Sequence, residues 1–164
     1  MLKFKLTPAQ TFLCLCIRHC EYLEKDKIIQ LYDSVRGVNN SLKSDATDAE
    51  IVRTDGLTRF DTDGFTIGKH VYNNRNTSPY VAWSWDMGNN TPTGFSCVLS
   101  TGNATVKEVG GVGFQPDLVI NETRSAHQNN FIYDAIRGPR RVLRTNHDVA
   151  EADSDALAAF RPDG

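Results

Sequence analysis

The chain has 164 residues, of which 40% are hydrophobic and 23% are charged, and its formal net charge is -2. This length and composition are typical of a globular protein with one large domain or two small ones. The near-neutral charge excludes a strong field that would draw the whole chain to nucleic acid or to an anionic membrane, so neither is an expected partner.

The first apolar segment, residues 11–17, is too short to cross a bilayer, which takes about 20 apolar residues. Arg18 and His19 follow it with no small-residue cleavage pattern, so the segment does not resemble a signal peptide. We expect a β-strand there.

Three of the four cysteines crowd into this part of the chain, which does not suggest a disulfide framework. With His19 they also suggest a zinc site, but the distant second ligand pair of a structural zinc site is missing. On a strand, two of them would share a face as small hydrophobic residues. The cysteines are Cys14, Cys16, Cys20 and Cys97.

The chain repeats itself. "LYDSVRG" begins at Leu31, and "IYDAIRG" begins at Ile132, about a hundred residues later, which is a whole-domain period. The agreement continues in order from residues 31–64 to residues 132–164. Matched positions include Tyr32/Tyr133, Asp33/Asp134, Arg36/Arg137, Gly37/Gly138, Leu42/Leu143, Glu50/Glu151, Leu57/Leu157, Phe60/Phe160 and Gly64/Gly164.

The two copies are cut at different points. The first continues beyond the repeat into further strand-like segments, whereas the second is preceded by segments that the first lacks. We therefore predict two partial homologous units, 1–88 and 94–164, joined by a linker at 89–93. Either the chain is part of a longer array or the missing strands come from a neighbouring chain, because an exposed sheet edge invites association.

Most local signals indicate β-structure, since short β-branched or aromatic runs alternate with turn residues. The expected strands include "KIIQLYDSV", "YVAWSWDM", "FSCVLS", "DLVIN", "NFIYDAI" and "RVLRT". A helical turn is expected only at 45–52 and at 147–160. Many short strands at this spacing predict an all-β, antiparallel sandwich or jelly roll.

In "YVAWSWDM", alternation places Val81, Trp83, Trp85 and Met87 on one face of a strand. The two tryptophans could stack on a sugar, but their apolar neighbours favour a core position. Tyr80, on the opposite face, is a candidate ligand contact.

The segment "FDTDG" offers Asp61 and Asp63 beside Gly64, which resembles an oxygen-rich calcium loop. The glutamate that such a loop needs is absent, and the second copy has Arg161 in place of the first aspartate. A glycine turn with an aspartate bonded to the backbone is the alternative interpretation.

The shared pairs Asp33/Arg36 and Asp134/Arg137 have two interpretations. Each could be a salt bridge that closes the end of a strand, or the arginine could hold a carboxylate or phosphate ligand. The basic run in the second copy is interpreted as a solvated face, and it consists of Arg137, Arg140, Arg141 and Arg144.

No serine or cysteine lies in a nucleophile motif, no histidines have paired metal spacing, and the glycine-rich stretch at 109–113 lacks the residues of a phosphate loop. A second acid to complete a glycosidase pair is not evident. We therefore expect a protein that is not an enzyme and that carries no cofactor.

The order of these phrases resembles a domain of tailed-phage structural proteins. The residues that carry the resemblance are 101–103, 110–120, 133–138, 60–68 and 80–85, within a match from about Ile28 to Gly164. The chain departs from this pattern in its first 27 residues and at Asp86, where the family usually has lysine.

The resemblance implies a virion structural protein: a tail-fibre, baseplate or capsid-decoration component. Its partners would be other virion proteins, further copies of itself and a glycan of the host surface. The alternative is a lectin-like carbohydrate-binding module. Such a module should expose an aromatic platform, whereas an assembly protein should bury Trp83 and Trp85 in an interface.

Overall fold

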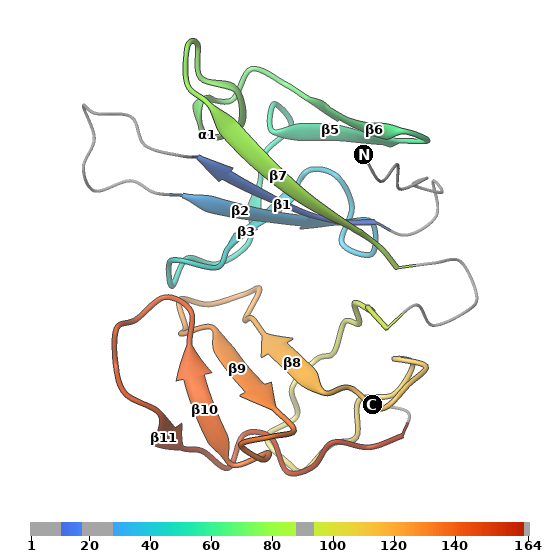
Figure 1. Ribbon diagram of the computed structural model, residues 1–164, viewed down its shortest axis with the longest axis vertical. Coiled ribbons are helices and arrows are strands. Elements are labelled where there is room, and N and C mark those ends of the chain that lie inside the picture. Colours follow the sequence, from blue (N-terminus) through green and yellow to red (C-terminus); the bar gives the residue numbers. More distant parts are fainter. Residues whose placement is uncertain (1–10, 18–27, 88–93, 163–164) are drawn as a thin grey trace.

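The computed structural model describes residues 28–87 and 94–162 together with the backbone of residues 11–17. Within this part of the chain the secondary structure is almost entirely β, in antiparallel sheets that fall into two groups (Figure 1). Both the all-β class and the internal repeat predicted from the sequence are confirmed. No helix in the described part is long and apolar enough to cross a membrane.

The first group is built around a five-stranded antiparallel sheet in the order β4-β3-β2-β1-β7. Its strands are β1 (Thr11–Ile17), β2 (Ile29–Asp33), β3 (Asn40–Lys43), β4 (Ile51–Val52) and β7 (Tyr80–Asp86). A two-stranded hairpin, β5 (Leu57–Asp61) and β6 (Gly64–Ile67), and a one-turn helix, α1 (Val71–Asn74), connect β4 to β7.

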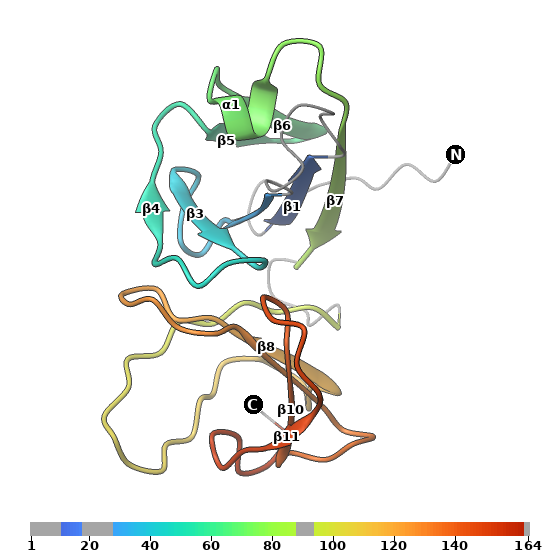
Figure 2. The same ribbon diagram turned by 90° about the vertical axis from the view of Figure 1, so that its left-hand side faces the viewer.

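The second group is a four-stranded antiparallel sheet in the order β11-β10-β9-β8. Its strands are β8 (Leu118–Asn121), β9 (Phe131–Asp134), β10 (Arg141–Arg144) and β11 (Ala152–Asp153). In both views the hairpin β5–β6 lies on the side of the first sheet that faces away from this second group (Figures 1 and 2).

The repeat seen in the sequence is also a repeat of topology. Strands β2, β3 and β4 follow the same course as β9, β10 and β11. Strand β1 pairs with β2 as β8 pairs with β9, with Leu13 opposite Tyr32 and Val119 opposite Tyr133. Strand β8 is therefore the structural counterpart of β1.

The turn between the repeated strands explains why both copies keep glycine at one position. Gly37 and Gly138 have φ values of 94° and 91°, a conformation that glycine adopts without steric cost. Each donates its N–H to the carbonyl oxygen of the aspartate that ends the preceding strand, Asp33 or Asp134, at 3.0 Å.

The described core lies between the five-stranded sheet and the hairpin. Tyr32 and Leu57 are fully buried, and four apolar side chains pack against them: Val38, Phe60, Phe65 and Ile67. The Tyr32 hydroxyl donates to Asn73 Oδ1 at 3.2 Å, so this core includes one buried polar contact. Tyr133 is the counterpart in the second sheet and is 2% exposed, but its hydroxyl bonds to Ser154 near the surface, at 3.1 Å.

Two secondary-structure predictions were wrong. Residues 94–103, which include the expected strand "FSCVLS", contain no strand, because they form no ladder of backbone hydrogen bonds with another segment. The expected helical turns at 45–52 and 147–160 are extended or bent instead and contain β4 and β11. Several of their acidic residues form ion pairs with other segments, as Asp48 does with Lys43 of β3. The boundaries 1–88, 89–93 and 94–164 stay a prediction.

The matched tyrosines give a test of this core. We expect Tyr32→Phe to lower the free energy of unfolding by about 1–3 kcal/mol, because Asn73 is fully buried and would lose its partner. Tyr133→Phe should cost about 1 kcal/mol or less, since Ser154 can bond to water instead. Urea unfolding monitored by far-UV circular dichroism measures both, and equal losses would contradict this account of the core.

Candidate functional site

The two units are joined through the loop between β3 and β4. The second unit bonds to the backbone of this loop at several points: Gln128 N–H donates to the Thr47 carbonyl at 3.1 Å, and Asn130 Nδ2 donates to the Lys43 and Ala46 carbonyls at 2.9 and 3.1 Å. Because Asn130 is only 5% exposed, these bonds lie within a packed contact.

A chain of four charged side chains continues this contact, and we call it the ionic joint: Asp33, Arg36, Glu50 and Arg124. Arg36 bonds to Asp33 through Nε and to Glu50 through Nη1, the latter at 3.1 Å. Arg124, from the second unit, donates two hydrogen bonds to the same Glu50 carboxylate, at 2.7 and 2.9 Å. The side chains of Asp33, Arg36 and Glu50 are 1%, 4% and 11% exposed and so are largely shielded from water, whereas Arg124 is 43% exposed.

The electrostatics of the joint follow from this geometry. Burial alone would raise the pKa of Glu50, but the hydrogen bonds from Arg124 and Arg36 hold that pKa below its usual value. Two carboxylates alternate with two guanidinium groups, so the joint as a whole is neutral. Buried charges need this kind of pairing to be tolerated.

For Arg36, the joint supplies the salt bridge that the sequence suggested. Besides its two acidic partners, its Nη2 donates to the Leu31 carbonyl at 3.1 Å, so every guanidinium nitrogen bonds within the protein. The salt bridge between Arg36 and Asp33 is present, and the role of Arg36 in ligand binding stays a prediction. The sequence could not show that Arg124 and Glu50 would bury it.

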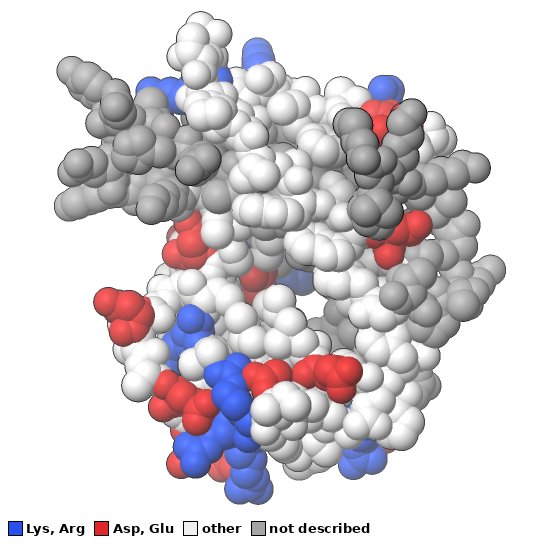
Figure 3. Space-filling model, in the orientation of Figure 1, with Lys and Arg blue, Asp and Glu red and all other residues white. Residues whose placement is uncertain are grey.

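In the second unit the equivalent arginine is more accessible. Arg137 repeats the bonds to its aspartate, Asp134, and its Nη1 lies 3.6 Å from Glu151. Its side chain is 28% exposed, and Arg141 joins the same acid. In Figure 3, blue and red atoms adjoin on this part of the surface, which is a solvated face of paired charges.

Next to the joint lie two groups with shifted pKa values. Burial, followed by the charge of Asp33, raises the pKa of the Cys97 thiol to about 12, so this cysteine is not an activated nucleophile. Burial also raises the pKa of Glu122 to about 7, and its Oε1 atom is buried with no hydrogen-bond partner. The joint contains equal numbers of acids and arginines, and Glu122 is an additional acid beside it that has no arginine partner of its own among the described residues.

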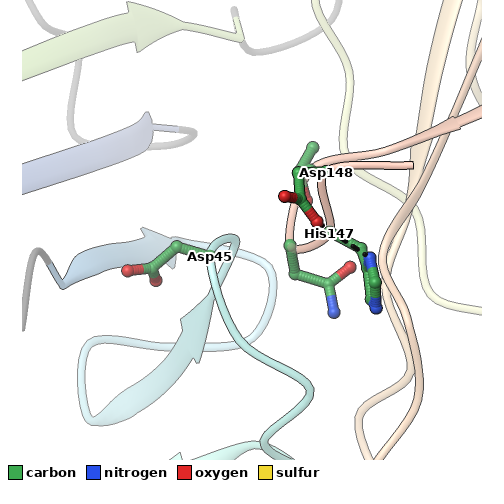
Figure 4. A pocket seen from close by; sticks show the side chains of 5 residues that line it. Asp45, His147 and Asp148 are labelled. Atoms are coloured by element: carbon green, nitrogen blue, oxygen red, sulfur yellow. Dashed lines mark ion pairs between the residues drawn. The ribbon is translucent and has the colours of Figure 1, made fainter. Parts of the chain in front are cut away.

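A hollow of about 470 Å³ opens beside the contact between the units and is lined by Asp45, Thr145, Asn146, His147 and Asp148 (Figure 4). His147 Nδ1 and Asp148 Oδ1 are 3.5 Å apart on its edge. The Asp45 carboxylate points away from them and accepts a hydrogen bond from the Ile29 N–H at 3.2 Å. The lining groups therefore do not converge on a common point.

The Asp61 carboxylate bonds to side chains of its own hairpin. It pairs with Arg59 and accepts a hydrogen bond from the Thr66 hydroxyl at 2.7 Å, and these contacts lower its pKa. Asp63 is exposed in the turn that leads to Gly64, whose φ is 155°. No group of three or more histidine, cysteine or acidic residues that could hold a metal ion occurs among the described residues. The side chains of the N-terminal cysteines lie outside that part.

Strand β7 carries the other predicted site residues. The Tyr80 hydroxyl donates to the Val71 carbonyl at 3.0 Å and accepts a hydrogen bond from the Arg75 N–H at 2.7 Å, so it anchors the chain around α1 to β7. The prediction that Trp83 and Trp85 belong to the core was wrong, because they are 48% and 40% exposed. The second unit covers only part of this face of the sheet, where Phe95 stacks on Trp85 with ring centroids 5.7 Å apart.

Two apolar strips therefore remain accessible, and each lies on a strand at the end of its sheet. The β7 strip consists of Val81, Trp83 and Trp85. The β8 strip consists of Leu118 and Ile120, which are 56% and 52% exposed. Scattered apolar residues are ordinary on a surface, but strips along sheet edges mark a surface that binds a partner. These strips are the candidate functional surface.

The repeat supplies a matched test of the ionic joint. We expect Glu50→Ala to lower the free energy of unfolding by about 3 kcal/mol, because Arg36 is buried and loses a partner. Glu151→Ala removes the equivalent acid from an exposed position and should cost about 1 kcal/mol or less. Thermal unfolding measures the difference, and similar losses would show that the joint is not buried in solution.

The raised pKa of Glu122 predicts a pH dependence. The folded state favours its protonated form, so this group stabilises the fold below its usual pKa of 4.5 and the stabilisation is lost as the pH rises to about 7. The full loss corresponds to about 3 kcal/mol. Glu122→Gln should therefore match the original protein near pH 4.5 and be more stable at pH 8 by chemical denaturation. Glu108→Gln, at a 69% exposed acid, is the control and should not change the profile.

Comparison with known proteins supports the repeat. The family described as "Domain of unknown function (DUF7483)" matches the chain twice, over residues 20–96 and 91–164. No curated protein and no solved structure matches the chain. The two family matches together cover most of the sequence and correspond to the two groups of strands, except that β1 precedes the first match. The chain belongs to this DUF7483 domain family and contains two copies of its domain.

Proposed function

We propose that this chain is a virion structural protein of a tailed phage, a component of the tail fibre, baseplate or capsid decoration. It would act by assembling with itself and with other virion proteins on the particle surface, where it would contribute to host attachment. The assignment to a phage rests on the sequence resemblance alone. The assembly role rests on a feature of the fold.

The observation that carries the assembly role is the pair of exposed strips at two sheet edges. A protein that acts alone rarely leaves large apolar side chains along an unpaired strand, because such edges pair with other chains. Both strips lack charged side chains, and charge is what commonly protects a sheet edge. In Figure 1, β7 crosses the front of the first unit, and Figure 3 shows few charges in that area.

The chemistry of the described residues also favours a role without catalysis. The joint arginines bond to acids of the same chain, the thiol of Cys97 is held protonated, and the groups lining the hollow do not converge. Host attachment would come from many weak contacts displayed together in an assembly, which raises avidity without any single strong site.

A second function has one observation in its favour. Exposed tryptophans on a strand are the usual platform for stacking a sugar ring, and Trp83 and Trp85 are both about half exposed. A lectin-like carbohydrate-binding module would use them in this way. An assembly protein would instead cover them with a neighbouring subunit.

One experiment separates the two. If the chain is an assembly protein, its sedimentation coefficient should rise with concentration and its tryptophan emission should shift to the blue, because the tryptophans become buried. Addition of hexoses or N-acetylhexosamines at millimolar concentration should then leave the emission unchanged. A concentration-independent monomer whose emission is quenched by one of these sugars would overturn the assembly role and support the binding module.

A further inference from the structure

Strand β8 is at the end of its sheet, and no described strand pairs with its outer edge. Its four residues, Leu118–Asn121, include no charge and no proline, which are the usual means of blocking an edge. Leu118 and Ile120 are more than half exposed. The backbone groups and side chains of β8 thus leave an edge that can accept another strand.

The first unit shows what occupies this position in the same fold. Strand β1 is the counterpart of β8, and its outer edge pairs with β7 along seven residues, from Thr11 opposite Asp86 to Ile17 opposite Tyr80. The pairing is antiparallel. In the first unit the edge equivalent to that of β8 is therefore paired with an antiparallel strand, β7, which is uncharged and mostly apolar from Tyr80 to Trp85.

Strand β7 itself can provide a second edge. It ends the five-stranded sheet, so its inner edge pairs with β1 and its outer edge has no described strand beside it. Between Tyr80 and Trp85 the strand is uncharged, and Val81 and Trp83 are 37% and 48% exposed. One molecule therefore carries one acceptor edge on β8 and one complementary edge on β7.

We propose that β8 of one molecule pairs antiparallel with the outer edge of β7 of a second copy, so that copies join head to tail. With Trp83 opposite Ile120, Trp85 lies opposite Leu118 on the same face, because cross-strand neighbours share a face. This register covers four half-exposed apolar side chains at once. The proposal rests on the proposed assembly role and assigns the strands that carry it.

The contact is heterologous, since two different edges meet. Such contacts produce rings when the rotation between copies closes and open filaments when it does not. A symmetric contact of β8 with β8 of a second copy would instead stop at a dimer. This difference lets a pair of variants distinguish the two arrangements.

The test uses Ile120→Lys, which damages the β8 edge, and Trp83→Lys, which damages the β7 edge. Each variant alone should be largely monomeric by sedimentation velocity, with the dissociation constant raised by about 100-fold, because a lysine would be buried in an apolar contact. When the two are mixed, each still has one intact edge, so they should form a one-to-one heterodimer and nothing larger. Native mass spectrometry identifies that species by its mass.

Val52→Lys is the matched control. Val52 is 69% exposed on β4, at the other end of the first sheet, so this variant should assemble like the original protein. Far-UV circular dichroism and thermal unfolding establish that all three variants are folded.

The outcomes separate this proposal from the proposed function. If the original protein assembles and both edge variants assemble equally well, another surface is used and the β7–β8 pairing is wrong. If Trp83→Lys still dimerises while Ile120→Lys does not, the contact is β8 with β8 and the proposal is overturned. Loss of assembly in Val52→Lys as well would also overturn it. If the original protein is monomeric at all concentrations, the assembly role falls together with the pairing.

Discussion

One carboxylate, that of Glu50, lies at the centre of the contact between the two units. Glu50 receives Arg36 from its own unit and Arg124 from the next, so a single side chain ties the repeated turn of the first unit to the start of the second sheet. The arginine on the inner side is almost fully buried, which is tolerable only while both acids remain with it. Beside this chain of charges, residues of the second unit also bond to the backbone of the β3–β4 segment. These directional bonds fix the relative orientation of the two units more closely than apolar packing alone would.

The equivalent residues of the second unit are more exposed to solvent than those of the first. Asp134, Arg137 and Glu151 repeat the first three members of the ionic joint, but the second arginine on Glu151 is Arg141 of the same unit, at 3.6 Å, and not one from another unit. The hairpin that covers Tyr32 also has no described counterpart over Tyr133. Each of the two homologous units thus has its own sheet of the same topology, and the units differ in the segments that cover this sheet. The first unit is covered by its own hairpin on one face and in part by the second unit on the other.

Much of the fold could be predicted from the sequence, because alternation and turn residues are local signals. The strands at 80–86, 118–121, 131–134 and 141–144 and the repeat itself belong to this category. The candidate surface could not be predicted, because alternation shows that Trp83 and Trp85 share a face but not what covers that face. The joint was also missed, although the recurrence of Glu50 at Glu151 was a usable signal. Its partner Arg124 lies 74 residues away, and nothing in the local pattern connects the two.

Buried ionisable groups and accessible apolar side chains lie in different parts of this molecule. The groups with the most perturbed chemistry, Cys97 and Glu122, lie beside the joint, where burial disfavours the charged form of both side chains. The accessible apolar groups lie instead along the outer strands of the two sheets, where the backbone can also bond. A surface that offers apolar contact and backbone bonding together is suited to adding a strand. The ionic joint connects the two units that carry these outer strands, so under the proposed pairing it would fix the direction in which successive copies join.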